Sequence, residues 1–145
     1  MLKLLLDEHI SPSVAVGLRR RQRLLTVHCM VDWEKGQFLG QDDSACLEHA
    51  ATLGLTLVTY DRRTIPPLLK AWAEEQRNHG GAIFIDEKTI SPADIGGQVR
   101  ALANLAGKLR NGIGRTAFAI CSASGGLRPT GRSRSLPYAL KRFTN

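Results

Sequence analysis

The chain contains few cysteines, no long hydrophobic run and, in its last third, no acidic residue. Its three cysteines, Cys29, Cys46 and Cys121, are far apart and form no Cys-x-x-Cys pair, so neither a zinc site nor a disulfide framework is expected. No apolar run approaches the roughly 18 residues of a membrane span. Asp7 also ends the first apolar run too early for a signal peptide. These absences predict one soluble, cytoplasmic domain with no membrane partner.

Charge is divided unevenly along the chain. Residues 1–94 hold 11 Lys/Arg and 13 Asp/Glu, whereas residues 95–145 hold nine Lys/Arg and no acid, which gives the net charge of +7. A basic segment of this kind suggests a polyanion such as nucleic acid as partner, although a solvated tail that binds nothing would look the same. The candidate nucleic-acid contacts are Arg110, Arg115, Arg128, Arg132 and Arg134.

Segments with strand and helix patterns alternate along the chain. Apolar, branched runs predict strands at 2–6, 24–29, 55–60, 81–86 and 116–121. Helices are expected from Ser11-Pro12 to about 23, at 42–53, from Thr64 to about 77, and from Ser91-Pro92 to about 109, where Ser11 and Ser91 are candidate N-caps. This alternation predicts an α/β fold with a parallel sheet of four or five strands, covered on both faces. Residues 1–126 would form the domain, and 127–145 a basic, flexible tail.

Acidic residues follow several of the predicted strands. Asp7 and Glu8 follow the first strand, Asp61 follows the third and Asp86 ends the fourth, while Asp42 and Asp43 begin a helix. Taken singly, each has an ordinary explanation as a cap, a turn residue or a solvated acid. However, ligands of parallel sheets bind beyond the carboxyl ends of the strands. Carboxylates gathered there repel one another unless a cation neutralises them.

Carboxylate oxygens favour Mg²⁺ or Mn²⁺, and these ions commonly support phosphoryl transfer. The sequence therefore predicts a metal site built from strand-end acids. Three motifs follow one another along the chain: "LLLDEHISPSVAVGLRR", "GQDDSACLEHA" and "GLTLVTYDRR". Together they resemble the PIN-like domains, in particular the compact PIN-like proteins found as toxins beside an antitoxin gene.

The resemblance implies a three-layer α/β/α sandwich and a Mg²⁺- or Mn²⁺-dependent endoribonuclease. By position, Asp7, Asp43 and Asp61 match the family's catalytic and metal-binding acids. The partners it implies are RNA, an antitoxin protein and a second copy of the chain in a homodimer. Glu8, Asp42 and Asp86 are secondary candidates from their positions at the same edge of the sheet.

The last motif departs from the family's usual Asp-x-Asp-Phe, because Arg62, Arg63 and Thr64 follow Asp61. Arg62 or Arg63 could contact a scissile phosphate, or Arg63 could mark a degenerate site that only binds nucleic acid or protein.

A receiver domain is a further alternative, since it also has an acidic pair after strand one and an Asp after strand three. It requires Ser or Thr after strand four and Lys after strand five, but this chain has Asp86 and "AICSAS".

Overall fold

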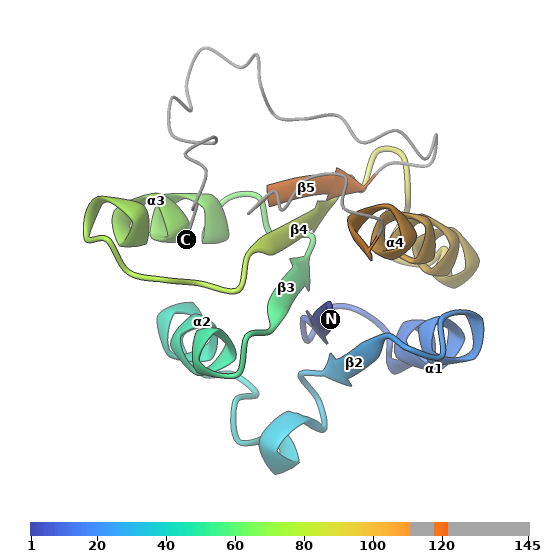
Figure 1. Ribbon diagram of the computed structural model, residues 1–145, viewed down its shortest axis with the longest axis horizontal. Helices are drawn as coiled ribbons and strands as arrows, with labels where there is room; N and C mark the ends of the chain where they lie inside the picture. Colours follow the sequence, from blue (N-terminus) through green and yellow to red (C-terminus); the bar gives the residue numbers. More distant parts are fainter. Residues whose placement is uncertain (111–117, 122–145) are drawn as a thin grey trace.

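The computed structural model describes residues 1–110 and 118–121 of the chain, and at Arg110 and 118–121 it describes the backbone. Five short strands form one parallel sheet in the order β2-β1-β3-β4-β5 (Figure 1). The strands are β1 (Lys3–Leu6), β2 (Thr26–Cys29), β3 (Thr56–Thr59), β4 (Ala82–Ile85) and β5 (Phe118–Cys121). The expected α/β class and parallel sheet are confirmed.

Four helices cover the two faces of the sheet. They are α1 (Pro12–Arg21), α2 (Asp43–Thr52), α3 (Ile65–Glu74) and α4 (Ile95–Arg110). Helices α1 and α4 lie together on one side of the strands, and α2 and α3 on the other (Figure 1). The arrangement agrees with a three-layer sandwich.

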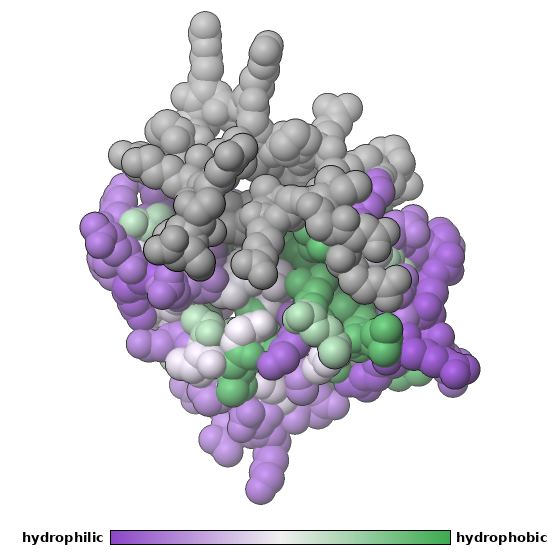
Figure 2. Space-filling view, viewed as in Figure 1, coloured by the Kyte–Doolittle hydropathy of each residue, from purple (hydrophilic) through white to green (hydrophobic). Residues whose placement is uncertain are grey.

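The core is divided by the sheet into two apolar clusters. Leu4 and Leu6 of β1 pack with α1 and α4, whereas Leu5, between them, packs with α2 and α3. Side chains alternate between the two faces along a strand, so a strand buried on both faces must be apolar throughout. Figure 2 shows hydrophilic residues around the edge of the visible face and hydrophobic ones toward its middle.

Local signals explain most helix starts. The Ser11 hydroxyl accepts a hydrogen bond from the Ser13 N–H (3.3 Å) at the start of α1, as expected of an N-cap. The start expected at Ser91 is wrong, because Ser91 instead accepts from Ala93 in a turn. Helix α4 begins at Ile95, and the Asp94 carboxylate accepts from the Gly97 N–H (2.8 Å). Asp94 therefore caps this helix.

The loop expected at 31–41 includes a short 3₁₀ helix, η1 (Trp33–Gly36), with Glu34 and Lys35 at positive φ. The tail predicted at 127–145 lies outside the described residues. Within the part of the chain that the structure describes, no helix has the length and apolar character needed to cross a membrane.

Candidate functional site

Strands β1 and β3 are neighbours at the centre of the sheet, and their carboxyl ends bring Asp7 and Asp61 to the same edge. The strand order 2-1-3-4-5 places the topological switch point between these two strands, where ligands of doubly wound sheets bind. The Asp7 N–H donates to the carbonyl oxygen of Val58 (3.0 Å), which extends the ladder of β1 and β3 to the first acid. Asp7 is therefore held by the sheet.

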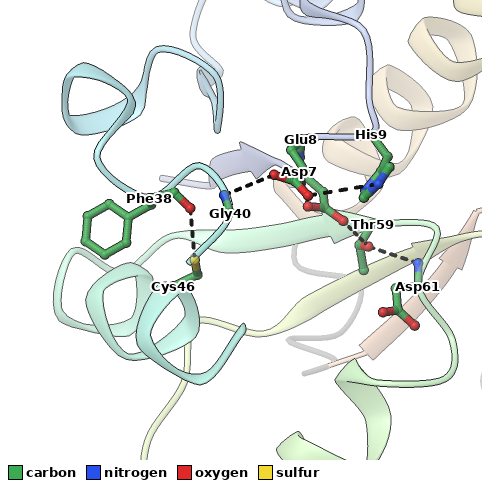
Figure 3. Close-up of polar contacts among 8 residues, drawn as sticks. All are labelled: Asp7, Glu8, His9, Phe38, Gly40, Cys46, Thr59 and Asp61. Atoms are coloured by element: carbon green, nitrogen blue, oxygen red, sulfur yellow. Dashed lines mark hydrogen bonds and ion pairs between the residues drawn. The ribbon is translucent and has the colours of Figure 1, made fainter. Parts of the chain in front are cut away.

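A buried hydroxyl connects the two acids. Thr59 is fully buried at the end of β3, and its Oγ1 donates to Asp7 Oδ2 at 2.6 Å. The same Oγ1 accepts from the backbone N–H of Asp61 at 2.9 Å. Figure 3 shows this connection from Asp7 through Thr59 to Asp61. The other Asp7 oxygen, Oδ1, accepts from the Glu8 N–H (2.7 Å), so the carboxylate is fixed at both oxygens.

Asp61 organises the turn that leads into α3. Its Oδ1 accepts from the backbone N–H groups of Arg63 (2.7 Å) and Thr64 (2.8 Å). Burial by itself would raise the pKa of Asp61, but the hydrogen bonds from Thr64 and Arg63 and the charge of Arg63 outweigh it and leave the pKa below its usual range. Asp61 is thus held as a carboxylate.

Asp43 approaches the same place from the first turn of α2. Burial, followed by the charges of Asp61, Asp7, Asp42 and Glu8, raises the pKa of Asp43 above its usual range. Like charges in one place have this effect when no cation lies between them. Asp7, Asp43 and Asp61, from three separate parts of the chain, line one pocket.

A pocket of about 490 Å³ lies at this edge and is lined by Asp7, Asp43 and Asp61. Arg63 contributes a positive charge to its wall, and Met30 and Ile65 contribute apolar surface. Its volume falls within the range of ligand-binding pockets. The pocket therefore combines hard oxygen donors, a guanidinium and an apolar wall.

The loop between β2 and α2 forms one rim of the pocket. The Gly40 N–H donates to Glu8 Oε2 (3.4 Å), and Cys46 Sγ donates to the carbonyl oxygen of Phe38 (3.7 Å) (Figure 3). The Phe38 ring points away from the carboxylates and stacks on Trp33 and His49. Glu8 therefore ties the rim to the end of β1, and Phe38 packs against Trp33 of the loop and His49 of α2.

The remaining candidates from the sequence lie in different places. Asp42 caps α2 by accepting from the Ser44 N–H (3.1 Å), and Asp86 accepts from the Lys88 N–H (3.1 Å) in the turn after β4. Neither they nor Arg62 line the pocket, whereas Glu8 and Arg63 do. Arg110 ends α4, and Arg115, Arg128, Arg132 and Arg134 lie outside the described residues.

The acids of the pocket are the donors that a divalent cation would need. Among residues 1–110 and 118–121, no three His, Cys, Asp or Glu side chains stand close enough together to hold a metal ion. The chemistry of the set does fit Mg²⁺ or Mn²⁺, because Asp7, Asp43 and Asp61 offer carboxylate oxygens to one pocket. Binding would require these side chains to move closer together.

Several polar residues of the site were missed in the sequence: His9, Gln41, Cys46 and Tyr60 line the pocket, and Thr59 connects two of its acids. Thr59 is the last residue of β3 and stands two positions before Asp61. Residues two apart in an extended chain lie on the same face, so this spacing could have indicated that Thr59 lies near the acids. Cys46 also lines the pocket, and burial, followed by the charges of Asp43, Asp7, Asp42 and Glu8, raises its pKa to about 11. Its thiol is therefore not a nucleophile at neutral pH.

Comparison of the chain with family models, with curated proteins and with solved structures found no match.

Proposed function

We propose that the chain is a metal-dependent endoribonuclease of PIN-like type, acting on single-stranded RNA. The observation that carries the proposal is the convergence of Asp7, Asp43 and Asp61 on one pocket at the switch point of the sheet. The resemblance of the three sequence motifs to PIN-like toxins supports it. That an antitoxin protein controls the enzyme, and that the chain forms a homodimer, stay predictions from the same resemblance.

Asp7, Asp43 and Asp61 would hold Mg²⁺ or Mn²⁺, which would supply an activated water and neutralise charge at the phosphate. The chain's own residues have distinct parts. Thr59 orients Asp7 through the 2.6 Å hydrogen bond, and the turn hydrogen bonds keep Asp61 ionised. Arg63, on the pocket wall, would hold the scissile phosphate as a fixed positive charge.

A receiver-type phosphoacceptor is the second candidate, because the strand order 2-1-3-4-5 also occurs in receiver domains. In that case Asp61 would accept a phosphoryl group from a small phosphodonor in the presence of Mg²⁺. The position after β4 is against this candidate, since Asp86 stands there in place of Ser or Thr and its carboxylate is used in a turn.

The first experiment is a thermal melt of the wild type and of Asp7→Asn with and without millimolar Mn²⁺. A ligand at about 100 times its Kd stabilises the folded state by about 2.7 kcal/mol, so the wild-type melting temperature should rise clearly. Asp7→Asn should lose the shift. Asp86→Asn is the matched control, because it removes a strand-end acid outside the pocket and should keep the shift.

The second experiment measures cleavage of a labelled single-stranded RNA in Mn²⁺. EDTA should abolish cleavage, and Asp7→Asn should lower the rate by about 100-fold or more, the size of effect seen when one electrostatic contact to the reacting group is lost. Cleavage that survives both changes would contradict the proposal. If the wild type is inert but Arg63→Asp cuts, the protein is a degenerate nuclease that binds rather than cleaves. If a small phosphodonor phosphorylates Asp61 and the protein does not cleave RNA, the receiver-type function is favoured instead.

A further inference from the structure

The two helical layers of the sandwich differ sharply in charge. Helices α1 and α4 together carry six Lys/Arg and no acid. Helices α2 and α3, on the opposite side of the sheet, carry three acids and one lysine. The sequence contains no acid anywhere in residues 9–31 or 95–110. One outer layer of the molecule is therefore predominantly basic, with Asp94 at the start of α4 as an acid in it.

Helices α1 and α4 pack side by side (Figure 1), and the residue pairs between them show that they run parallel. Gly17 lies against Val99, and one turn further along, Gln22 Nε2 donates to the carbonyl oxygen of Ala103 (3.4 Å). The chain therefore brings the arginine-rich end of α1 beside the middle of α4. Charges that are about 80 positions apart in sequence thus lie in one layer.

Four exposed arginines, which we call the basic face, lie in this layer: Arg20, Arg21, Arg23 and Arg100. Among the residues described by the structure, none of the four forms an ion pair with an acid. On the opposite side, by contrast, Lys70 pairs with Glu74 (3.8 Å) and Arg77 with Glu48 (3.1 Å). Arg100 does have an acid nearby, because its guanidinium and the Asp94 carboxylate lie on the same side of Gly96. The unneutralised charge of the basic face therefore comes mainly from Arg20, Arg21 and Arg23, which form no ion pair within the described residues.

The structural role of helix ends accounts for only part of this charge. Cations are favoured in the last turn of a helix, which explains Arg20 and Arg21. Arg19 serves the fold directly, since its Nη2 donates to the carbonyl oxygen of Val27 (2.5 Å). Arg23 lies beyond the helix and Arg100 lies in the second turn of α4, so the helix dipole gives no reason for either.

We propose that the basic face binds the sugar–phosphate backbone of RNA and holds the strand at a distance from the pocket. The choice of RNA rests on the proposed function. Helix α1 begins just after Asp7 and the pocket, and its ten residues span about 15 Å. A strand that leaves the pocket along α1 therefore reaches the basic face after a few nucleotides. Longer RNAs should bind more tightly than very short ones.

The test measures binding of a labelled single-stranded oligoribonucleotide by fluorescence anisotropy, in EDTA, over a series of salt concentrations. The variant is Arg20→Gln/Arg21→Gln/Arg23→Gln. Loss of three phosphate contacts should flatten the slope of log affinity against log salt by about 2, because each contact to a single strand contributes about 0.7. The matched control is Lys35→Gln/Lys70→Gln/Lys88→Gln, which removes the same charge from exposed lysines on other surfaces and should leave the slope nearly unchanged.

The two proposals fail separately. If the wild type cleaves RNA in Mn²⁺ but the arginine variant keeps the wild-type affinity and slope, the basic face is overturned and the nuclease stands. If the wild type does not cleave but only the arginine variant loses affinity, the nuclease fails and the basic face stands. Equal loss in the arginine and lysine variants would show a general effect of charge and would overturn the basic face. A thermal melt of each variant confirms that it is folded.

Discussion

At the scale of single residues, Thr59 has the least conspicuous sequence signal and the most central position. Its hydroxyl both donates to Asp7 and accepts from the Asp61 N–H, so it sets the distance between the two strand-end acids. Removal of this buried hydroxyl would leave the Asp7 carboxylate without one of its hydrogen-bond donors, which costs free energy of folding. The residue therefore connects the end of the sheet to the geometry of the pocket.

Replacement of Thr59 by valine, which has nearly the same shape, should destabilise the protein by about 1–3 kcal/mol and weaken the Mn²⁺-induced rise in melting temperature. Thr56→Val is the control, because Thr56 is at the other end of the same strand and its hydroxyl donates to the carbonyl oxygen of Gly80 (2.7 Å). It should cost similar stability and keep the Mn²⁺ shift. An unchanged Mn²⁺ response in both variants would show that Thr59 does not position the site.

At the scale of elements, the basic layer depends on how closely α1 and α4 approach. A Cβ added at Gly17 would lie 2.6 Å from Val99 Cγ2, which is closer than atoms can pack. The absence of a side chain at this one position allows the helices to touch. Close contact there keeps the arginines of α1 beside α4.

Gly17→Ala should therefore destabilise the protein by about 1–3 kcal/mol, the usual cost of overpacking, although alanine is by itself the better helix former by about 1 kcal/mol. In a Val99→Ala background the clash is removed, so the same change should become stabilising. Urea denaturation of the four proteins in this double-mutant cycle measures the reversal. A destabilisation of equal size in both backgrounds would mean that the Gly17–Val99 contact does not limit the packing.

At the scale of the whole molecule, the acids at the pocket make stability depend on pH. The folded-state pKa of Asp43 is raised by burial and by its acidic neighbours, so keeping it ionised at neutral pH costs stability. That cost disappears as pH falls through the folded pKa toward the unfolded value of 3.8. The lowered pKa of Asp61 acts in the opposite sense, since its contribution is present above 3.8 and is lost as pH falls through the folded pKa.

Asp43→Asn should accordingly be more stable than the wild type near neutral pH, and this advantage should shrink as pH falls to about 4. Because water screens the partly exposed carboxylate, the advantage should be only a few tenths of a kcal/mol. Urea denaturation of both proteins across that range gives the difference. Burial lowers the pKa of His79, so its protonation also destabilises the fold in acid, but this effect is shared and cancels. Asp86→Asn serves as control, and a constant advantage across the pH range would contradict the explanation.

The sequence by itself determined the local structure. The apolar runs and the Ser11-Pro12 start signal follow from backbone sterics and side-chain periodicity, which act within a few residues, so strands and most helices fall where they were expected. The sequence also placed Asp7 and Asp61 just after strands. The start of α4 was misplaced because two nearby signals compete, and only packing selects Asp94 over Ser91.

Only the tertiary structure decided which elements became neighbours. That β1 lies beside β3, with the acids and Thr59 in contact, depends on burial of both sheet faces by segments far apart in the chain. The approach of Asp43 to those acids and the gathering of arginines from α1 beside α4 have the same origin. Long-range packing has no local signature in the sequence, because it is the whole buried surface that selects the arrangement.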